Sequence, residues 1–463
     1  MENVIKPRLR TKVLHGIGIW LVISGILIPL SSVGAKSALT LQGQSAQSAQ
    51  HAQGAKSALT WQAAVTEATR NNAELKAAQQ NLDAANTNIQ VARSGYLPKI
   101  SASFTAGING SDATRSMDPS TYGDLQSKVN DSYGASIEAS ETIFDGFATQ
   151  SRVSQAQSRV RETEQQIQIL KARLSYDLKT AYSGMMQAQR SLRLYQDIIK
   201  RREENLRLVE LRFAGGQENK GAVRLSEAYL KQARFEEMQA RDNFNVTRAR
   251  LNTVLGRGDD TSYELRNDVP LSDIPGLVDF ASLARNTPDY RLNRAQEETA
   301  TADLSLARAG FYPQLGVRGS IGRQDDKFFP EDEAWSLSLV LTVPLFSGGS
   351  DYYTRQGAIN RLTAAGLTRE NAERDIVARL RQAHVTLAES AERLKVDESF
   401  REAVTLRAEI ARSKYNNGLT TFDDWDLIES DLITRQRAVL SSQGNRVIAE
   451  AAWEQAQGRG ALQ

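Results

Sequence analysis

The stretch ARSGYLP at residues 92–98 returns as ARAGFYP at residues 307–313. Three further matches keep the same order along the chain. They are Arg70-Asn71 with Arg285-Asn286, Phe144-Asp145-Gly146 with Phe346-Ser347-Gly348, and Phe213-Ala214-Gly215-Gly216 with Tyr415-Asn416-Asn417-Gly418. One such match could arise by chance, but a series in one order indicates an internal repeat. The sequence therefore predicts a chain built from two halves of one plan.

Each half predicts a helix, two strands, a long helix, a turn and a returning helix. The helical patterns cover residues 59–93, 147–213 and 218–256 in the first half, and 279–309, 350–414 and 420–457 in the second. The predicted organisation is a first repeat at 58–256, a connector at 257–278, a second repeat at 279–457 and a tail at 458–463. Pro and Asp residues act as helix breakers in the connector.

The long helix of the first half carries a heptad seam. Steps of three and four residues from Leu178 reach Ala181, Met185, Ala188, Leu192, Tyr195, Ile199, Arg202, Leu206, Val209 and Phe213. The long helix of the second half carries a corresponding heptad seam, which starts at Leu380 and becomes polar at Asp397 and Arg401. An apolar period of 3.5 residues indicates supercoiled helices. At ~1.5 Å per residue, the helix 147–213 would span on the order of 100 Å, which is too long for a compact globule.

Four stretches alternate apolar and polar residues with a period of two, beginning at Ile100, Tyr133, Leu315 and Trp335. The clearest apolar stripe is Trp335, Leu337, Leu339 and Leu341, which we predict to face lipid. Each stretch has about the ten residues that a tilted strand needs to cross a membrane. The opposite face of Ser, Gly, Thr and charged residues suits a water-filled lumen. A soluble sheet packed on a core would also alternate.

Four strands do not close a membrane barrel, because even small barrels of this kind use about eight. Open strand edges cannot face lipid, since their N–H and C=O groups would be unpaired there. Several chains are therefore predicted to contribute strands to one barrel.

The N-terminus predicts a secretory signal peptide at residues 1–35. Lys6, Arg8, Arg10 and Lys12 precede the apolar run at 16–30, and small residues follow at 33–35. A membrane anchor is the alternative, although the run is shorter than the ~20 residues that a spanning helix needs. A flexible linker is predicted at residues 36–57, where the word GAKSALT at 34–40 recurs at 54–60.

Composition excludes several classes of function. The chain has no cysteine, so it forms no disulfide, thiolate metal site or lipidated N-terminal cysteine. A formal net charge of +2 does not predict a nucleic-acid partner. Three histidines are too few and too scattered for a histidine metal site. There is no phosphate-binding loop and no credible Ser/His/Asp set, so neither an enzyme nor a cofactor is predicted.

Across residues 59–457 the chain resembles the TolC family of outer-membrane efflux and secretion ducts. The resemblance rests on the ARSGYLP and ARAGFYP words, the FDG and FSG words, and the turns RFAGG and KYNNGLTTFDDW. It implies an α+β membrane protein: a trimeric transmembrane β-barrel with four strands from each chain, continued by a long periplasmic α-helical coiled-coil barrel. It also implies a location in the bacterial outer membrane, extending into the periplasm.

The function implied by the resemblance is a channel in a tripartite export system. A homotrimer would pass small molecules such as drugs or toxic compounds from a periplasmic adaptor and an inner-membrane pump to the exterior. One alternative is the outer-membrane duct of a one-step protein secretion system. An alternative of another class is a periplasmic structural coiled coil or adaptor, which does not account for the repeated strands.

The second helical turn carries the candidate gate, Tyr415, Asp423, Asp424 and Asp426. Acidic residues at a helix start are also favoured by the helix dipole alone. The resemblance implies that this turn closes the periplasmic entrance, with Tyr415 as the gate tyrosine and Asp424 as the first ring aspartate. Two family positions fall on Leu427 and Thr420 instead of an acid and a base, so a ring shifted toward Asp423 and Asp426 is the alternative to a ring at Asp424. The predicted adaptor-docking tips are Gly216, Gln217, Gly418 and Leu419.

Overall fold

The computed structural model describes residues 57–111, 128–258 and 261–462, all within one unit that begins at Ser57. The predicted signal peptide at 1–35 and the predicted linker up to residue 56 lie outside the described residues. The same order of elements occurs in both halves of the chain. A helix leads into two strands, and a long helix then reverses into a shorter one.

Apart from the starts of α2 and α6, the bounds of the main helices and strands lie within a few residues of the predicted ones. The first half contains α2 (Ala73–Arg93), β2 (Lys99–Ser111), β3 (Lys128–Phe144), α3 (Ala148–Ala214) and α4 (Lys220–Leu255). The second half contains α6 (Pro288–Ala309), β5 (Gln314–Asp325), β6 (Glu333–Thr342), α7 (Ser350–Asn416) and α8 (Phe422–Ala456). Both long helices, α3 and α7, have 67 residues, which confirms the prediction of very long helices.

Two helices that were predicted to be continuous are each divided into shorter elements. The stretch 59–93 contains β1 (Ser57–Leu59), α1 (Trp61–Asn71) and then α2. Asn72 breaks the helix with an extended backbone, and its side chain accepts a hydrogen bond from the Leu75 amide at 2.9 Å. Asparagine is a preferred N-cap, so this residue ends one helix and starts the next.

The stretch 279–309 divides in the same way into α5 (Phe280–Arg285) and α6. Thr287 caps α6 by accepting a hydrogen bond from the Tyr290 amide at 3.3 Å. Pro288 occupies the first turn, where its missing N–H is not needed. Both predictions failed because a break of one or two capping residues interrupts an otherwise helical pattern.

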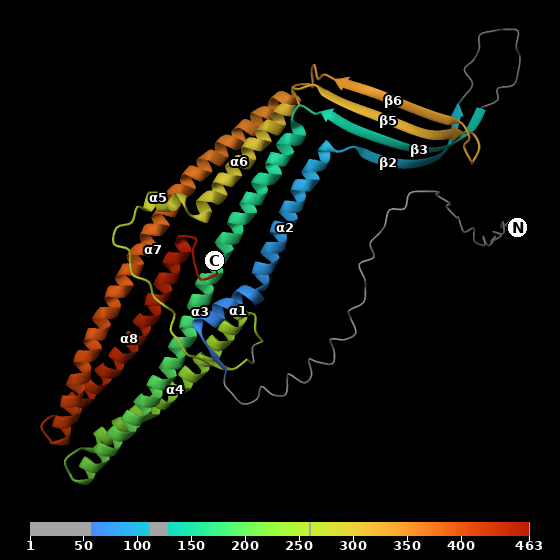
Figure 1. Cartoon of the computed structure of the whole chain (residues 1–463). Helices are drawn as coiled ribbons and strands as arrows, with labels where there is room; N and C mark the ends of the chain where they lie inside the picture. The colour runs from blue at the N-terminus through green and yellow to red at the C-terminus, as the bar shows by residue number, and fades with distance from the viewer. Residues whose placement is uncertain (1–56, 112–127, 259–260, 463) are drawn as a thin grey trace, which may run out of the picture. The chain divides into compact units, whose positions relative to one another are not determined.

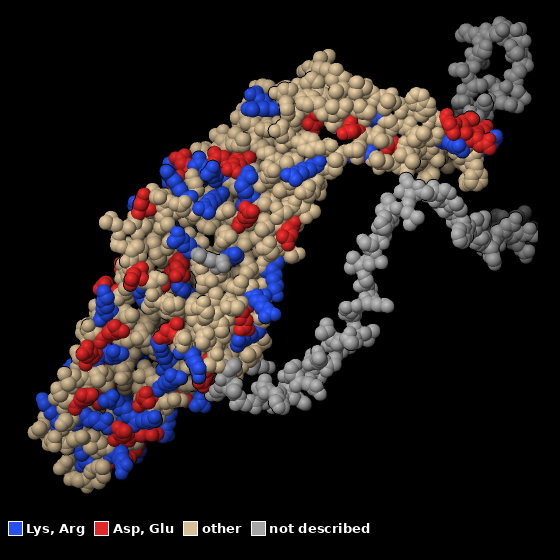
Figure 2. Space-filling view, in the orientation of Figure 1, with Lys and Arg blue, Asp and Glu red and all other residues tan. Residues whose placement is uncertain are grey.

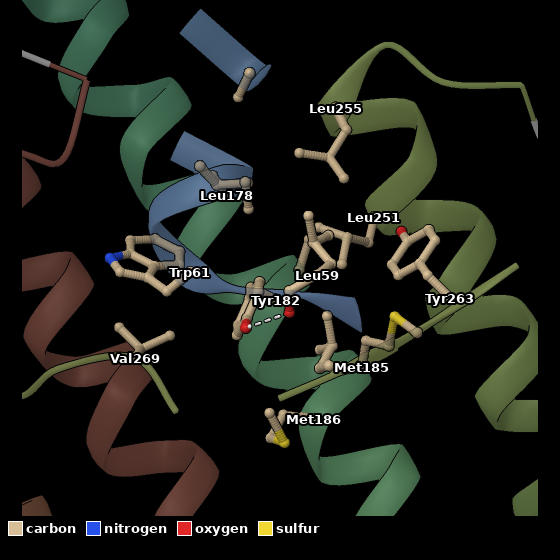
Figure 3. Close-up of a cluster of buried hydrophobic side chains, with 14 of the residues drawn as sticks. Leu59, Trp61, Leu178, Tyr182, Met185, Met186, Leu251, Leu255, Tyr263 and Val269 are labelled. Atoms are coloured by element: carbon tan, nitrogen blue, oxygen red, sulfur yellow. Dashed lines mark hydrogen bonds between the residues drawn. The ribbon is translucent and has the colours of Figure 1, made fainter. Parts of the chain in front are cut away.

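The connector also differs from its prediction, since it contains β4 (Tyr263–Leu265). This strand pairs in parallel with β1. Three residues per strand are too few to produce a periodic sequence signal. The two strands sit in a buried cluster formed with α1, α3 and α4, in which Leu59, Tyr182 and Leu251 meet (Figure 3).

Helix α3 is the central element of the helical part. It packs against α2, α4, α6 and α8, while α7 packs against α6 and α8. Figure 1 shows the α3–α4 and α7–α8 pairs as two long hairpins whose turns lie at the end away from the sheet. Seam residues such as Leu178, Ala181 and Met185 are buried. Farther along, Ile198 is buried in place of the predicted Ile199, and Phe213 is exposed.

The four longer strands form one antiparallel sheet in the order β2-β3-β5-β6. Its register aligns Ala102, Ile137, Ile321 and Trp335 across the sheet. On the other face, hydroxyl pairs join Ser103 to Ser136 at 2.9 Å and Ser320 to Ser336 at 2.8 Å. The sheet thus has one apolar and one polar face, as the alternation predicted. Among the described residues, no helix is both long and apolar enough to cross a membrane.

Candidate functional site

Two helical turns lie together at the end of the long hairpins, and both are built by the same local rule. At the first turn, Gly216 has a φ of +70°, and the Gln217 amide donates to the Arg212 carbonyl at 2.8 Å. At the second turn, Gly418 has a φ of +73°, and the Leu419 amide donates to the Lys414 carbonyl at 2.8 Å. This left-handed helix end favours glycine, which explains why the two turns share a sequence word.

Tyr415 joins the two turns. Its ring is fully buried and stacks on Trp425, with 4.3 Å between the centroids and 10° between the planes. Its hydroxyl donates to Glu218 Oε2 at 2.9 Å, and its carbonyl accepts from Arg212 Nη1 at 2.7 Å. The Arg212 guanidinium also lies 4.7 Å from the ring centroid. Arg212 and Glu218 both belong to the other hairpin, so this tyrosine is the centre of a contact between hairpins.

Burial raises the pKa of the Tyr415 hydroxyl above its ordinary value, and the hydrogen bond to Glu218 raises it further. The phenol is therefore neutral at physiological pH and acts as a hydrogen-bond donor. Its partner accepts as a carboxylate, which makes this a charge-assisted bond of the stronger class.

The three aspartates after the turn have different surroundings. Asp426 is nearly buried and forms an ion pair with Arg202 Nη1 at 2.9 Å. Asp424 is exposed and accepts from the Thr421 hydroxyl at 2.7 Å, while its amide donates to the Thr421 side chain at 3.2 Å. Thr421 is therefore the N-cap of α8, and its hydroxyl also holds the Asp424 carboxylate at the start of that helix. Asp423 is exposed.

A second layer of ion pairs lies next to the turns, between α3 and α8. Arg201 Nε lies 2.8 Å from Glu429 Oε2, and the Glu429 side chain is buried. Arg202 also donates to the Ser430 hydroxyl at 3.2 Å and lies 4.5 Å from the centroid of the Tyr229 ring. Burial, and next the hydrogen bond to Asp426, raise the pKa of Tyr229. Next to the turns, the contact between the hairpins therefore combines these buried ion pairs with an apolar cluster to which Val209 and Phe422 belong.

The sequence prediction included Tyr415 and Asp426 but missed their partners. Arg212, Glu218 and Arg201 were not singled out, and neither were Trp425 and Glu429. One signal did exist, because Arg202 falls in an otherwise apolar heptad row. A charge at such a position needs a partner when it is buried, but the sequence did not show that the partner lies on α8.

The predicted docking and lipid-facing residues are all exposed. At the tips, Gly216, Gln217 and Gly418 are exposed, and Leu419 is 73% exposed. Along β6, Trp335, Leu337, Leu339 and Leu341 have between 63% and 79% of their surface exposed. Figure 2 shows a mostly uncharged sheet, whereas Lys and Arg are intermixed with Asp and Glu over the helices down to the turns.

Comparison with known proteins gives a family match in two segments, one in each half of the chain. A family described as "Outer membrane efflux protein" has a model that matches residues 64–257 and 281–459. The chain is 22% identical over 391 residues to the alkaline protease secretion protein AprF of Pseudomonas aeruginosa, covering 81% of this chain and 78% of that protein. It is 22% identical over 420 residues to the outer membrane efflux protein BepC of Brucella suis, covering 87% of each. Among solved structures, the outer membrane protein VceC of Vibrio cholerae has a TM-score of 0.73 at 19% identity, covering 86% of this chain and 96% of that one.

Proposed function

The chain belongs to the outer membrane efflux protein family and is an outer-membrane export channel, and from this premise we propose that it passes small toxic molecules from a periplasmic adaptor and an inner-membrane pump to the exterior. One observation carries the proposal. A sheet with an exposed apolar face is joined to two long hairpins in a single chain. Such a molecule can place one end in a bilayer and extend the other far into an aqueous space.

The oligomer that we propose is a homotrimer with one shared barrel. The sheet of each chain ends at β2 on one side and at β6 on the other. In lipid, those outer edges need a hydrogen-bonding neighbour, and a second copy offers the matching edge. The two halves act as structural repeats within this ring, which agrees with a family model that matches in two segments.

The two turns form the periplasmic gate in this proposal. Tyr415 ties the second hairpin to Arg212 and Glu218 of the first, and Arg202 ties α3 to Asp426. Separating the hairpins would break all of these contacts together, so they favour a closed entrance. Because Asp426 already has a cationic partner, the exposed Asp423 and Asp424 are the residues that we assign to the negative ring.

The tips dock the adaptor in this proposal. Gln217 and Leu419 each follow the turn glycine and are exposed. A partner that binds there could pull on both turns, and it would act directly on the contacts of Tyr415.

The function is tested in a strain from which the gene is deleted. Susceptibility to a panel of detergents, dyes and antibiotics should rise, and the parental gene should restore resistance. The matched control is the Leu339→Arg variant expressed from the same plasmid, which should fail to restore it. Unchanged susceptibility across the panel would contradict a small-molecule cargo.

A protein cargo is the second candidate, because the alkaline protease secretion protein matches over most of both chains. The same deletion strain distinguishes a protein cargo from a small-molecule cargo. Loss of a secreted protein from the culture medium without a change in susceptibility would favour protein secretion. The channel fold would be retained under either outcome.

A further inference from the structure

A groove with three basic side chains runs between α2 and α3, at the end of these helices that adjoins the sheet (Figure 1). Its volume is about 620 Å³, which lies within the range of pockets that hold drug-sized molecules. The basic residues are Lys99, Arg152 and Arg159, and all three are exposed. Uncharged residues such as Val91 and Ala156 complete the wall, and among the described residues no Asp or Glu lines it.

The three cations have little anionic compensation. Neither Lys99 nor Arg159 forms an ion pair with a described residue. Arg152 lies 3.9 Å from Asp145 Oδ2, at the limit of an ion pair. That oxygen already accepts from the Thr149 amide at 2.7 Å and from the Thr149 hydroxyl at 2.6 Å. Asp145 is therefore engaged in the first turn of α3, and the groove keeps an excess of positive charge.

The internal repeat shows that the fold does not require these charges. The halves align on the words ARSGYLP and ARAGFYP and on the equal lengths of α3 and α7. Position by position, the first half has Lys99, Arg152 and Arg159 where the second half has Gln314, Thr354 and Arg361. The same junction of helix, strand and long helix thus forms with an amide and a hydroxyl in place of two cations. Folding alone does not account for the basic groove.

The register of β2 places the groove on the polar side of the sheet. Lys99 alternates with Ile100 and shares its face with Ser101 and Ser103. On this face the hydroxyls of Ser103 and Ser136 pair at 2.9 Å. In the predicted barrel this is the face of the water-filled lumen, so the groove opens toward water rather than toward lipid.

We propose that this groove binds the anionic group of an organic acid inside the channel, such as the carboxylate, sulfonate or phosphate of an exported molecule. The inference rests on the proposed function and names a class of cargo for it. Lys99 approaches the anion from the strand, and Arg152 and Arg159 approach it from α3 with guanidinium groups suited to paired hydrogen bonds. Val91 and Ala156 offer apolar surface to the rest of the molecule, a combination typical of small-molecule pockets.

The acidic residues at the tips do not oppose this site. Asp423 and Asp424 lie at the start of α8, next to the turns, whereas the groove lies where α3 begins. Helix α3 has 67 residues, which corresponds to about 100 Å at ~1.5 Å per residue. Charges in solution are screened over about 8 Å at physiological ionic strength. The two ends of the channel therefore act on ions independently.

The site is tested by the binding of pyranine, a fluorescent trisulfonated dye, to the purified assembled protein in detergent. Fluorescence anisotropy should show saturable binding that weakens as salt is added. The variant Lys99→Gln/Arg152→Thr takes the residues that the second half has at these positions, and it should bind the dye about tenfold more weakly. The control Arg93→Gln/Arg308→Gln removes two exposed charges that do not line the groove and should bind like the parental protein.

Two results of this titration would overturn the proposal. One is a parental protein that does not bind the dye, or binds it no better than Lys99→Gln/Arg152→Thr. The other is an equal loss of binding in Arg93→Gln/Arg308→Gln, which would show an effect of net charge and not of the groove.

A second experiment separates a soluble anion in the lumen from the phosphate of a membrane lipid. The chain has no cysteine, so Lys99→Cys and Ile100→Cys each introduce a single thiol, on opposite faces of β2. In planar bilayers, a negatively charged, water-soluble methanethiosulfonate should change the single-channel conductance of Lys99→Cys and leave that of Ile100→Cys unchanged. The opposite pattern would place the groove against lipid and overturn the inference.

The outcomes distinguish this inference from the proposed function. A channel that conducts and responds to modification of Lys99→Cys, but whose dye binding does not depend on Lys99 and Arg152, keeps the proposed function and loses the organic-anion site. Unchanged susceptibility of the deletion strain would instead contradict small-molecule export, whatever the groove binds.

Discussion

At the scale of single residues, Tyr415 is the group whose removal best tests the gate. Tyr415→Phe keeps the stack on Trp425 but removes the hydroxyl that donates to Glu218. A hydrogen bond to a charged group contributes about 1.5–3 kcal/mol, so the balance between closed and open entrances should shift by about 10- to 150-fold. We expect a higher single-channel conductance in planar bilayers. The control variant Tyr176→Phe, on α3 away from the turns, should leave the conductance unchanged. Equal effects of the two substitutions would show that the Tyr415 hydroxyl does not hold the entrance closed.

The aspartates differ in what their loss should do. Replacing the exposed Asp423 and Asp424 by Asn should weaken cation selectivity and reduce block by divalent cations added on the periplasmic side, because close carboxylates attract cations. Asp426→Asn should instead loosen the hairpin contact, since it leaves Arg202 with a neutral partner in a nearly buried site. Reversal potentials in a salt gradient measure the first effect, and conductance measures the second. Unchanged selectivity in the double variant would leave these residues as ordinary helix-start acids.

Asp397 predicts a dependence of stability on pH. It is buried on α7, and the hydrogen bond from Ser442, followed by the interaction with Arg393, lowers its pKa. A lowered pKa in the folded state stabilises the protein at pH values above the unfolded pKa of about 3.9, and this stability is lost as the pH falls through the folded value. Thermal unfolding in detergent should therefore show a steeper fall below about pH 4 in the parental protein than in Asp397→Asn. Identical slopes would contradict the assignment.

At the scale of elements, β6 decides whether the sheet faces lipid. Its residues alternate between the stripe from Trp335 to Leu341 and a face that includes Ser336 and Ser338. Leu339→Arg should impair assembly, because an arginine at the midplane of a barrel costs about 2–4 kcal/mol on the lipid face. Ser338→Arg places the same charge on the opposite face and should assemble with an altered conductance. Heat-modifiable oligomers on gels report assembly, and equal tolerance of the two changes would refute the orientation.

At the scale of the whole molecule, the long helices separate the sheet, which we predict to lie in the membrane, from the tips, which we predict to bind the adaptor. Each of the two long helices has 67 residues, which corresponds to about 100 Å at ~1.5 Å per residue. Cysteines placed at Gln217 and Leu419 should cross-link to the adaptor in cells, because a turn can be recognised without unfolding a helix. Cysteines at Asp177 and Gln382, far from the tips along α3 and α7, are the matched controls. Stronger cross-linking at these controls than at the tips would place the docking site elsewhere.

The local features of this protein follow from the sequence alone. Each strand repeats a period of two, each long helix repeats a heptad, and each turn needs a glycine with positive φ at Gly216 or Gly418. These signals depend only on residues that are neighbours in the chain, so a single sequence reveals them. The order of the longer elements and the alternation of the four-stranded sheet were therefore predicted correctly, whereas β1, β4 and the breaks that separate α1 from α2 and α5 from α6 were not.

The tertiary structure alone decided which distant residues meet. Asn72 reads as one more polar residue of a helix until its capping role is seen. Tyr415 contacts Glu218, and Lys179 forms a buried ion pair with Glu450, although each pair lies far apart in the chain. Packing of one hairpin against another selects these partners, and no periodic pattern encodes that choice. The sequence thus determined the longer helices, the four-stranded sheet and the two turns of this channel, and the packing of the helices decided which charges and rings hold its two hairpins together.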